Sequence, residues 1–178
     1  LTEKEFTGRS LESELKQIVR ERDEIIRDRF DHEVEDGVSL DVGERMEAQE
    51  LFDLVGDALS DRLEMEASEI SRLLWEREKE GSTVISELAA VPHAMVEGEG
   101  KFGLALVRCR EGIHFSEESP DVKAVFVLLA SQDERNFYLR ALAAIAQVML
   151  EDEFEERWME ARNEEALRDV VLLGYRVR

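Results

Sequence analysis

The chain has 178 residues and carries 43 acidic against 23 basic side chains, a formal net charge of −20. Its 43% hydrophobic content supplies enough apolar surface for one folded domain with an appendage, which excludes a disordered chain. So negative a surface repels phosphate backbones, and this argues against nucleic acid as a partner. The longest apolar stretches, 124–132 and 141–150, are shorter than the roughly 20 residues that a membrane-spanning helix needs.

The sequence also bears on where the protein works. It begins with Leu1 and charged residues rather than with the apolar core of a signal peptide, so we expect a piece of a longer protein. Its single cysteine, Cys109, lies in an apolar run, which predicts a buried thiol in a reducing compartment and excludes intrachain disulfides. The cytoplasm is therefore the expected location.

A long amphipathic helix is predicted over residues 1–36. Apolar side chains recur there at helical spacing between charges, at Leu11, Leu15, Ile18, Ile25 and Phe30. Gly37 supplies the stop, because glycine accepts the left-handed conformation that ends many helices. Residues 1–38 are expected to form a linker helix before a domain at 39–178. The narrow apolar stripe can bury only one side of this helix. We expect that side to pack on the same domain, on a second copy of the chain, or on the rest of the parent chain.

The remainder of the chain alternates between helical and strand-like patterns. Helices are predicted over 46–63, 70–80, 133–150, 152–162 and 164–173, and strands over 102–109 and 122–130. Residues 110–121 are expected to form the loop between the strands. The near-continuous apolar strands indicate burial on both faces, which requires helices on either side of a sheet. The order of elements thus predicts a layered α/β domain.

His93 is the candidate for chemistry in this chain. The GEGK stretch at 98–101 lacks the spacing of a phosphate-binding loop, and the three histidines are too scattered to indicate a metal site. A neutral imidazole can attack a phosphoryl group if a hydrogen bond fixes its tautomer and donors hold the phosphate. Arg77, Ser82 and Thr83 are candidate donors. The residues alone leave two readings open, a phosphoryl acceptor and a structural histidine within a hydrogen-bond network.

The stretch REKEGSTVISELAAVPH carries three short motifs, Arg77-Glu78, Ser82-Thr83 and Ala90-Val91-Pro92-His93. Their order and spacing resemble the signature of enzyme IIA domains of the mannitol/fructose type, from the sugar phosphotransferase system (PTS EIIA type 2). The similarity extends over roughly 40–173. The resemblance implies a three-layer α/β domain with a small mixed β-sheet flanked by helices, here preceded by the long N-terminal helix.

The same resemblance implies roles for individual residues. His93 corresponds to the phosphoacceptor that takes phosphate from the phosphocarrier protein HPr, and Arg77 to the active-site arginine. The expected phosphate- or ligand-binding set is Ser82, Thr83, Glu78 and Tyr138. Tyr138 stands where the family has a second active-site histidine, and tyrosine cannot act as a cationic partner near neutral pH. We expect no cofactor, and the scattered histidines predict no metal site.

Two functions follow from the resemblance. In the first, this is a regulatory enzyme IIA-like domain on the cytoplasmic face of a membrane transporter of the amino-acid permease or antiporter type. It would control transport by binding a ligand, the membrane domain or a second copy. The striped N-terminal helix favours this role, as do Val84, Ser86 and Leu88 where the family has glycines. In the alternative, the domain is an active phosphotransferase that accepts a phosphoryl group on His93 from HPr.

Overall fold

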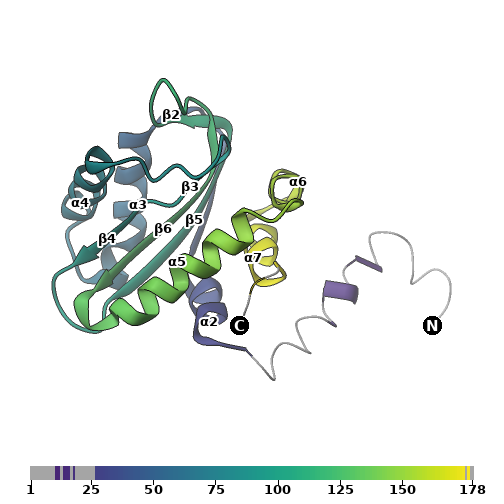
Figure 1. Ribbon diagram of the computed structural model, residues 1–178, viewed down its shortest axis with the longest axis horizontal. Coiled ribbons are helices and arrows are strands. Elements are labelled where there is room, and N and C mark those ends of the chain that lie inside the picture. The colour runs from purple at the N-terminus through teal and green to yellow at the C-terminus, as the bar shows by residue number, and fades with distance from the viewer. Residues whose placement is uncertain (1–10, 13, 17, 19–26, 175, 177–178) are drawn as a thin grey trace.

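The protein is described by a computed structural model that covers residues 11–12, 14–16, 18, 27–174 and 176 (Figure 1). Within residues 27–174 the helices are α2 (Arg29–Asp36), α3 (Ala48–Leu63), α4 (Ala67–Glu80), α5 (Arg135–Met149), α6 (Phe154–Glu160) and α7 (Glu164–Leu172), with a 3-10 turn at Gln132–Glu134. The strands are β1 (Val38–Val42), β2 (Met46–Glu47), β3 (Ala89–Ala90), β4 (His93–Val96), β5 (Phe102–His114) and β6 (Val122–Ser131). No helix in this described part combines the length and hydropathy needed to cross a bilayer.

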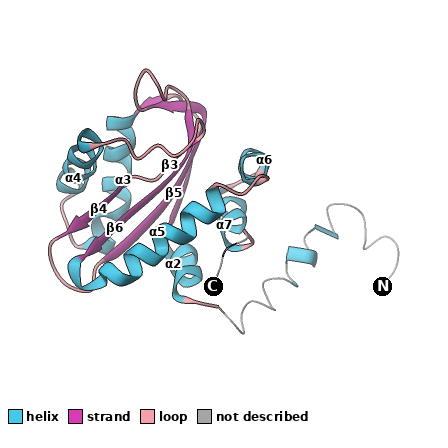
Figure 2. Cartoon of the chain, viewed as in Figure 1, coloured by secondary structure: helices cyan, strands magenta, loops and turns pink. Residues whose placement is uncertain are grey.

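The strands form one mixed sheet (Figure 2). The long strands β5 and β6 pair antiparallel at its centre. Strands β1 and β2 both run parallel to β5 along one side. Strands β3 and β4 run parallel to β6 along the other. The small mixed sheet expected from the sequence is thereby confirmed.

Alternate residues of the two central strands are buried on opposite faces of the sheet. Along β5, Leu104 and Leu106 pack with α2, α5, α6 and α7, whereas Ala105 and Val107 pack with α3 and α4. Strand side chains alternate between faces, so burial of both sets explains why these runs lack the polar alternation of a half-exposed strand. The predicted three layers are therefore present, with helices on both sides of the sheet (Figure 1).

The N-terminal helix differs from its prediction. Helix α2 begins only at Arg29, because Asp28 is extended and caps the helix by accepting a hydrogen bond from the backbone N–H of Asp31. A single helix through residue 36 is therefore not confirmed, and much of that prediction lies outside the described residues. The helix also ends at Gly37 for a different reason. Gly37 is extended rather than left-handed, and an added Cβ would lie 2.8 Å from the carbonyl oxygen of Glu33 and 2.9 Å from that of Leu104.

Several strand regions were not expected, among them the short strands β2, β3 and β4. Strand β1 at Val38–Val42 was not predicted, and β5 continues to His114 where the predicted loop should already have begun. The sheet register shifts between Arg108 and Ile113, and Gly112 adopts a φ of 97° inside this irregular stretch. Such a bulge places charged residues and a glycine inside a strand, so this segment resembles a loop in sequence.

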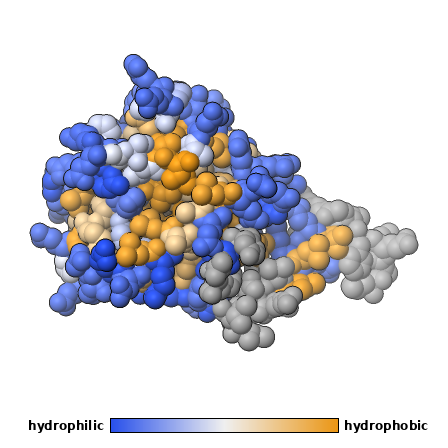
Figure 3. Space-filling model, in the orientation of Figure 1, coloured by the Kyte–Doolittle hydropathy of each residue, from blue (hydrophilic) through white to orange (hydrophobic). Residues whose placement is uncertain are grey.

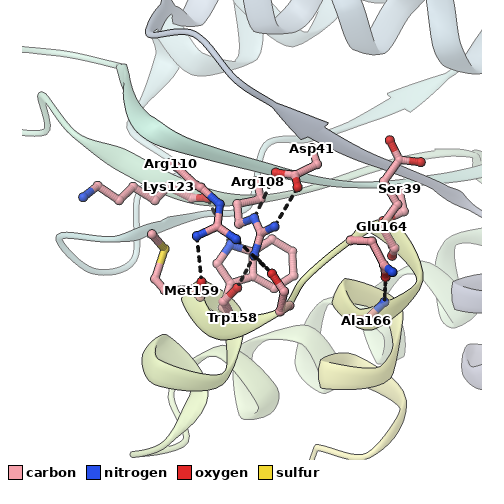
Figure 4. Close-up of polar contacts among 11 residues, drawn as sticks. Ser39, Asp41, Arg108, Arg110, Lys123, Trp158, Met159, Glu164 and Ala166 are labelled. Atoms are coloured by element: carbon pink, nitrogen blue, oxygen red, sulfur yellow. Dashed lines mark hydrogen bonds and ion pairs between the residues drawn. The ribbon is translucent and has the colours of Figure 1, made fainter.

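A buried arginine ties the sheet to the α6–α7 layer (Figure 4). The guanidinium of Arg108 is fully buried and donates to both carboxylate oxygens of Asp41, at 2.9 and 2.6 Å. It also donates to the carbonyl oxygens of Trp158 and Ala161 at the end of α6, while Arg110 donates to Ala161 as well. Unpaired carbonyls at a helix C-terminus need such donors.

Helix α2 is tied to the same layer by arginines. The guanidinium of Arg29 lies 4.1 Å from the ring centroid of Phe137 in α5 and forms an ion pair with Glu134. Arg176, near the end of the chain, donates to Asp28 at 2.8 Å. Burial alone raises the pKa of Asp28, but hydrogen bonds from Arg176 and from the backbone of Asp31 bring it down to about 2. These contacts hold α2 on the side of the sheet that carries α5.

Candidate functional site

His93 lies on an edge strand of the sheet, between α4 and α5. It is the first residue of β4 and pairs with Leu128 of β6, and the carbonyl of Pro92 accepts a hydrogen bond from the Leu128 N–H at 3.1 Å. Helix α4 contacts β4. Because Pro92 fixes the backbone immediately before it and β6 pairs beside it, His93 has a defined position while its half-buried ring stays accessible.

The two nitrogens of the His93 ring have different surroundings. Nδ1 lies 2.6 Å from the carbonyl oxygen of Val91. A carbonyl oxygen only accepts, so Nδ1 carries the proton and Nε2 keeps the lone pair in the neutral ring. Within the described part of the chain, no hydrogen bond engages Nε2. Among the described residues, the His93 ring is therefore bonded at one nitrogen and not at both.

Tyr138 lies beside the His93 ring. Their ring centroids are 6.1 Å apart and their planes are inclined by 55°. Burial raises the pKa of Tyr138 to about 12, and the nearby charge of Arg77 lowers it only in part. The phenol therefore stays protonated and neutral at physiological pH, so Tyr138 packs against the imidazole without adding a charge.

Arg77 reaches the same edge from the last turn of α4. One guanidinium nitrogen donates to the carbonyl oxygen of Gly81 at 2.9 Å, which caps the end of the helix. Its charge also lowers the pKa of Tyr138, which indicates that Arg77 lies near the tyrosine that neighbours His93. The remaining donors of the half-buried guanidinium suit the oxygens of a phosphoryl group.

Glu78 and Thr83, both expected to contact phosphate, are bonded to each other. The Glu78 carboxylate accepts the backbone N–H of Thr83 at 2.8 Å and also accepts its hydroxyl. Thr83 is 5% exposed, and both of its donors are used in this pair. Ser82 is exposed, and its hydroxyl oxygen accepts the N–H of Val84. Of the two hydroxyls predicted as phosphate donors, only that of Ser82 faces solvent.

Two large apolar side chains are exposed in segments that carry candidate residues. Ile85, between α4 and β3, is 39% exposed, and Leu139, which follows Tyr138 in α5, is 44% exposed. Figure 3 shows apolar surface near the centre of one face of the molecule, with hydrophilic margins. Sequence reasoning missed both this surface and the Val91 carbonyl, because a backbone acceptor leaves no trace in residue identity. Among the described residues, no group of three or more His, Cys, Asp or Glu side chains could hold a metal ion.

The fold and the site together define an α/β domain with a histidine on an edge strand, hydrogen-bonded at one ring nitrogen. A sequence model described as "Phosphoenolpyruvate-dependent sugar phosphotransferase system, EIIA 2" matches residues 35–172. The chain belongs to this family of enzyme IIA domains.

Individual relatives agree with this assignment. The mannitol-specific phosphotransferase enzyme IIA component of Bacillus subtilis (strain 168) is 30% identical over 122 residues, which is 67% of this chain and 82% of that protein. The fructose-specific EIIABC component of the same organism is 28% identical over 96 residues, which is 53% of this chain but only 15% of that longer protein. The solved nitrogen regulatory protein IIA-Ntr from Neisseria meningitidis shares the fold, with a TM-score of 0.68 at 24% identity over 75% of this chain and 92% of that one.

Proposed function

We propose that this domain accepts a phosphoryl group on Nε2 of His93 from an HPr-like phosphocarrier and passes it to a partner. One observation carries the proposal: the bond between Nδ1 and the Val91 carbonyl, which leaves the Nε2 lone pair as the nucleophile. Membership of the enzyme IIA family supports the choice of donor. The exposed Ile85 and Leu139 offer apolar contact area to a protein partner.

In the proposed step, the Nε2 lone pair of His93 attacks phosphorus while the donor's own bond to phosphorus breaks. The pair of electrons in that bond leaves with the donor, and the proton on Nδ1 stays bonded to Val91. Arg77 neutralises charge on the transferred group and the Ser82 hydroxyl donates to one of its oxygens. Tyr138 keeps its proton and fixes one side of the ring.

Phosphorylation from phosphoenolpyruvate through enzyme I and HPr tests the proposal. Wild type should gain acid-labile phosphate, His93→Ala should gain none, and Arg77→Ala should gain it more slowly. The matched control is His114→Ala, since His114 is a half-exposed histidine on β5 whose ring bonds the carboxylate of Glu47 in β2. Label that persists in His93→Ala, or wild type that stays unlabelled with every competent donor, contradicts the proposal.

A second candidate is regulation of a membrane transporter, with this domain on the cytoplasmic face. The contacts of α2 favour it, because Arg29 joins the segment before the domain to Phe137, the neighbour of Tyr138 in α5. A change at His93 could thus alter how the preceding segment docks, by a shift between two populations. The transporter would be of the amino-acid permease or antiporter type.

The N-terminal segment supplies a surface for such a partner. Leu11, Leu15 and Ile18 are 36%, 53% and 58% exposed, so their apolar stripe is available to the membrane domain or to a second copy. Deleting residues 40–178 from the parent should abolish regulation of transport, and Arg29→Ala should weaken it. Regulation that survives the deletion unchanged would rule this role out.

A further inference from the structure

We propose that Glu78 and Thr83 are a positioning pair for His93, which holds the Val91 carbonyl in place and thereby fixes the imidazole tautomer. Neither residue contacts the phosphoryl group in this assignment. The inference rests on the proposed phosphoacceptor role of His93, and it identifies the residues that prepare the ring for it.

A continuous series of hydrogen bonds joins the pair to the histidine. Glu78 accepts the N–H and the hydroxyl of Thr83. The carbonyl of Thr83 accepts the N–H of Val91 at 2.9 Å, and the carbonyl of Val91 accepts Nδ1–H of His93 at 2.6 Å. The N–H and C=O of Val91 are thus both engaged, the first by Thr83 and the second by the ring.

The pair fixes the base of the loop that precedes the histidine. Residues Val84 and Ala90 form an antiparallel bridge, and the bond from Val91 to Thr83 lies just beyond it. Thr83 therefore holds the start of the loop, and His93 comes shortly after its end. The side chain of Glu78 connects this base to α4, which is a rigid element.

The location of Glu78 supports a positioning role over phosphate binding. It lies in the last turn of α4, where the helix dipole disfavours a negative charge. Two donors from the 5%-exposed Thr83 offset that disadvantage. An ionised carboxylate is an acceptor without a proton to give, so it would repel a phosphoryl oxygen rather than bind it.

Strand pairing on either side of Val91 could instead hold its carbonyl, and so the tautomer of His93, without the Glu78–Thr83 pair. Val91 is also held by the pairing of its neighbours, since Ala90 pairs with Val125 and the Pro92 carbonyl accepts from Leu128. If these contacts were sufficient, removing the Glu78–Thr83 pair would leave the ring unchanged. The two possibilities therefore differ in a measurable property of His93 itself.

The test compares the imidazole ¹⁵N chemical shifts of His93 in the unphosphorylated wild-type chain and in four variants of it. Wild type should show a protonated Nδ1 and an unprotonated Nε2. Glu78→Ala and Thr83→Val should show a mixture of tautomers, whereas Glu78→Gln, which keeps an acceptor for Thr83, should recover much of the wild-type pattern. The control Glu80→Ala removes an exposed carboxylate two residues further along the same helix and should change nothing.

Phosphorylation rates complete the test. Glu78→Ala and Thr83→Val should accept phosphate from HPr about tenfold more slowly than wild type, because small misplacements of a nucleophile are costly. Wild-type tautomer patterns in both folded variants would overturn the proposal. If Glu78→Ala does not fold, the comparison of Thr83→Val with Thr83→Ser decides it. Failure of wild type to accept any phosphate would refute the phosphoacceptor role alone, because the tautomer comparison does not depend on it.

Discussion

Replacing Arg108 with methionine should destabilise the protein measurably. Methionine fills a similar volume but donates no hydrogen bond. The change leaves the Asp41 carboxylate without its two donors and removes a donor from the carbonyls of Trp158 and Ala161. Since the Arg108 guanidinium is fully buried at the join between the sheet and α6, water cannot easily replace its bonds to the carbonyls, whereas the Asp41 side chain is 27% exposed and can regain water.

The structure sets the size of the effect. The Asp41 side chain is 27% exposed and keeps contact with water, so the cost comes from the acceptors that lose the buried guanidinium and is about 1–3 kcal/mol, against the roughly 5–15 kcal/mol that stabilises a typical domain. Arg108→Lys should cost about half as much, because it keeps the charge but cannot bond Asp41 at two oxygens and the carbonyls at once. Both variants keep the rest of the core intact.

Urea unfolding of wild type and both variants measures the loss. The hydrogen bonds from Arg108 lower the pKa of Asp41. The pairing therefore stabilises the fold at pH values above the ordinary pKa of an aspartate, and this stabilisation is lost as the pH falls through the lower pKa of the folded state. The difference between wild type and Arg108→Met should therefore shrink in acid. A loss below about 1 kcal/mol at pH 7 would mean that Arg108 does not tie the sheet to α6.

Two further predictions concern other buried positions. In a Tyr175→Phe background, Tyr138 is the only tyrosine, and its ultraviolet titration should centre near pH 12 because burial raises its pKa to about 12. The folded state favours the neutral phenol, so the free energy of unfolding should fall as the pH rises from 10.0, the ordinary pKa of tyrosine, towards 12. A titration midpoint near 10.0 would contradict the burial of Tyr138. Gly56→Ala should cost about 1–3 kcal/mol in urea unfolding, because the added Cβ would collide with the carbonyl of Ala67 at the α3–α4 contact. Gly43→Ala, with nothing within 4 Å of the added carbon, is the matched control and should be nearly neutral.

Periodicity and apolar runs in the sequence predict most of the fold. Helices α3 and α4 and the central strands were expected because their apolar spacing is long and regular. Short strands such as β1 depend on pairing with residues far away in the chain, which no local pattern reports. The end of the helix at Gly37 was predicted correctly, but the expected left-handed conformation was wrong. A glycine is needed there because its backbone lies close to Leu104.

The sequence named candidate site residues but could not give the hydrogen bonds between them. His93 and Arg77 come from motif positions, and the structure places both near Tyr138. The mutual bonds of Glu78 and Thr83 could not be inferred, because a motif lists side chains without their partners. The burial of Cys109 was expected from its apolar neighbours and is confirmed, and burial raises the pKa of its thiol.

The nitrogen that carries the phosphoryl group tests the central claim most directly. After phosphorylation of ¹⁵N-histidine-labelled protein through HPr, NMR detects coupling between phosphorus and the bonded ring nitrogen. The account predicts coupling at Nε2 of His93, with Nδ1 still protonated and bonded to Val91. Phosphate on Nδ1, or on a residue other than His93, would contradict it.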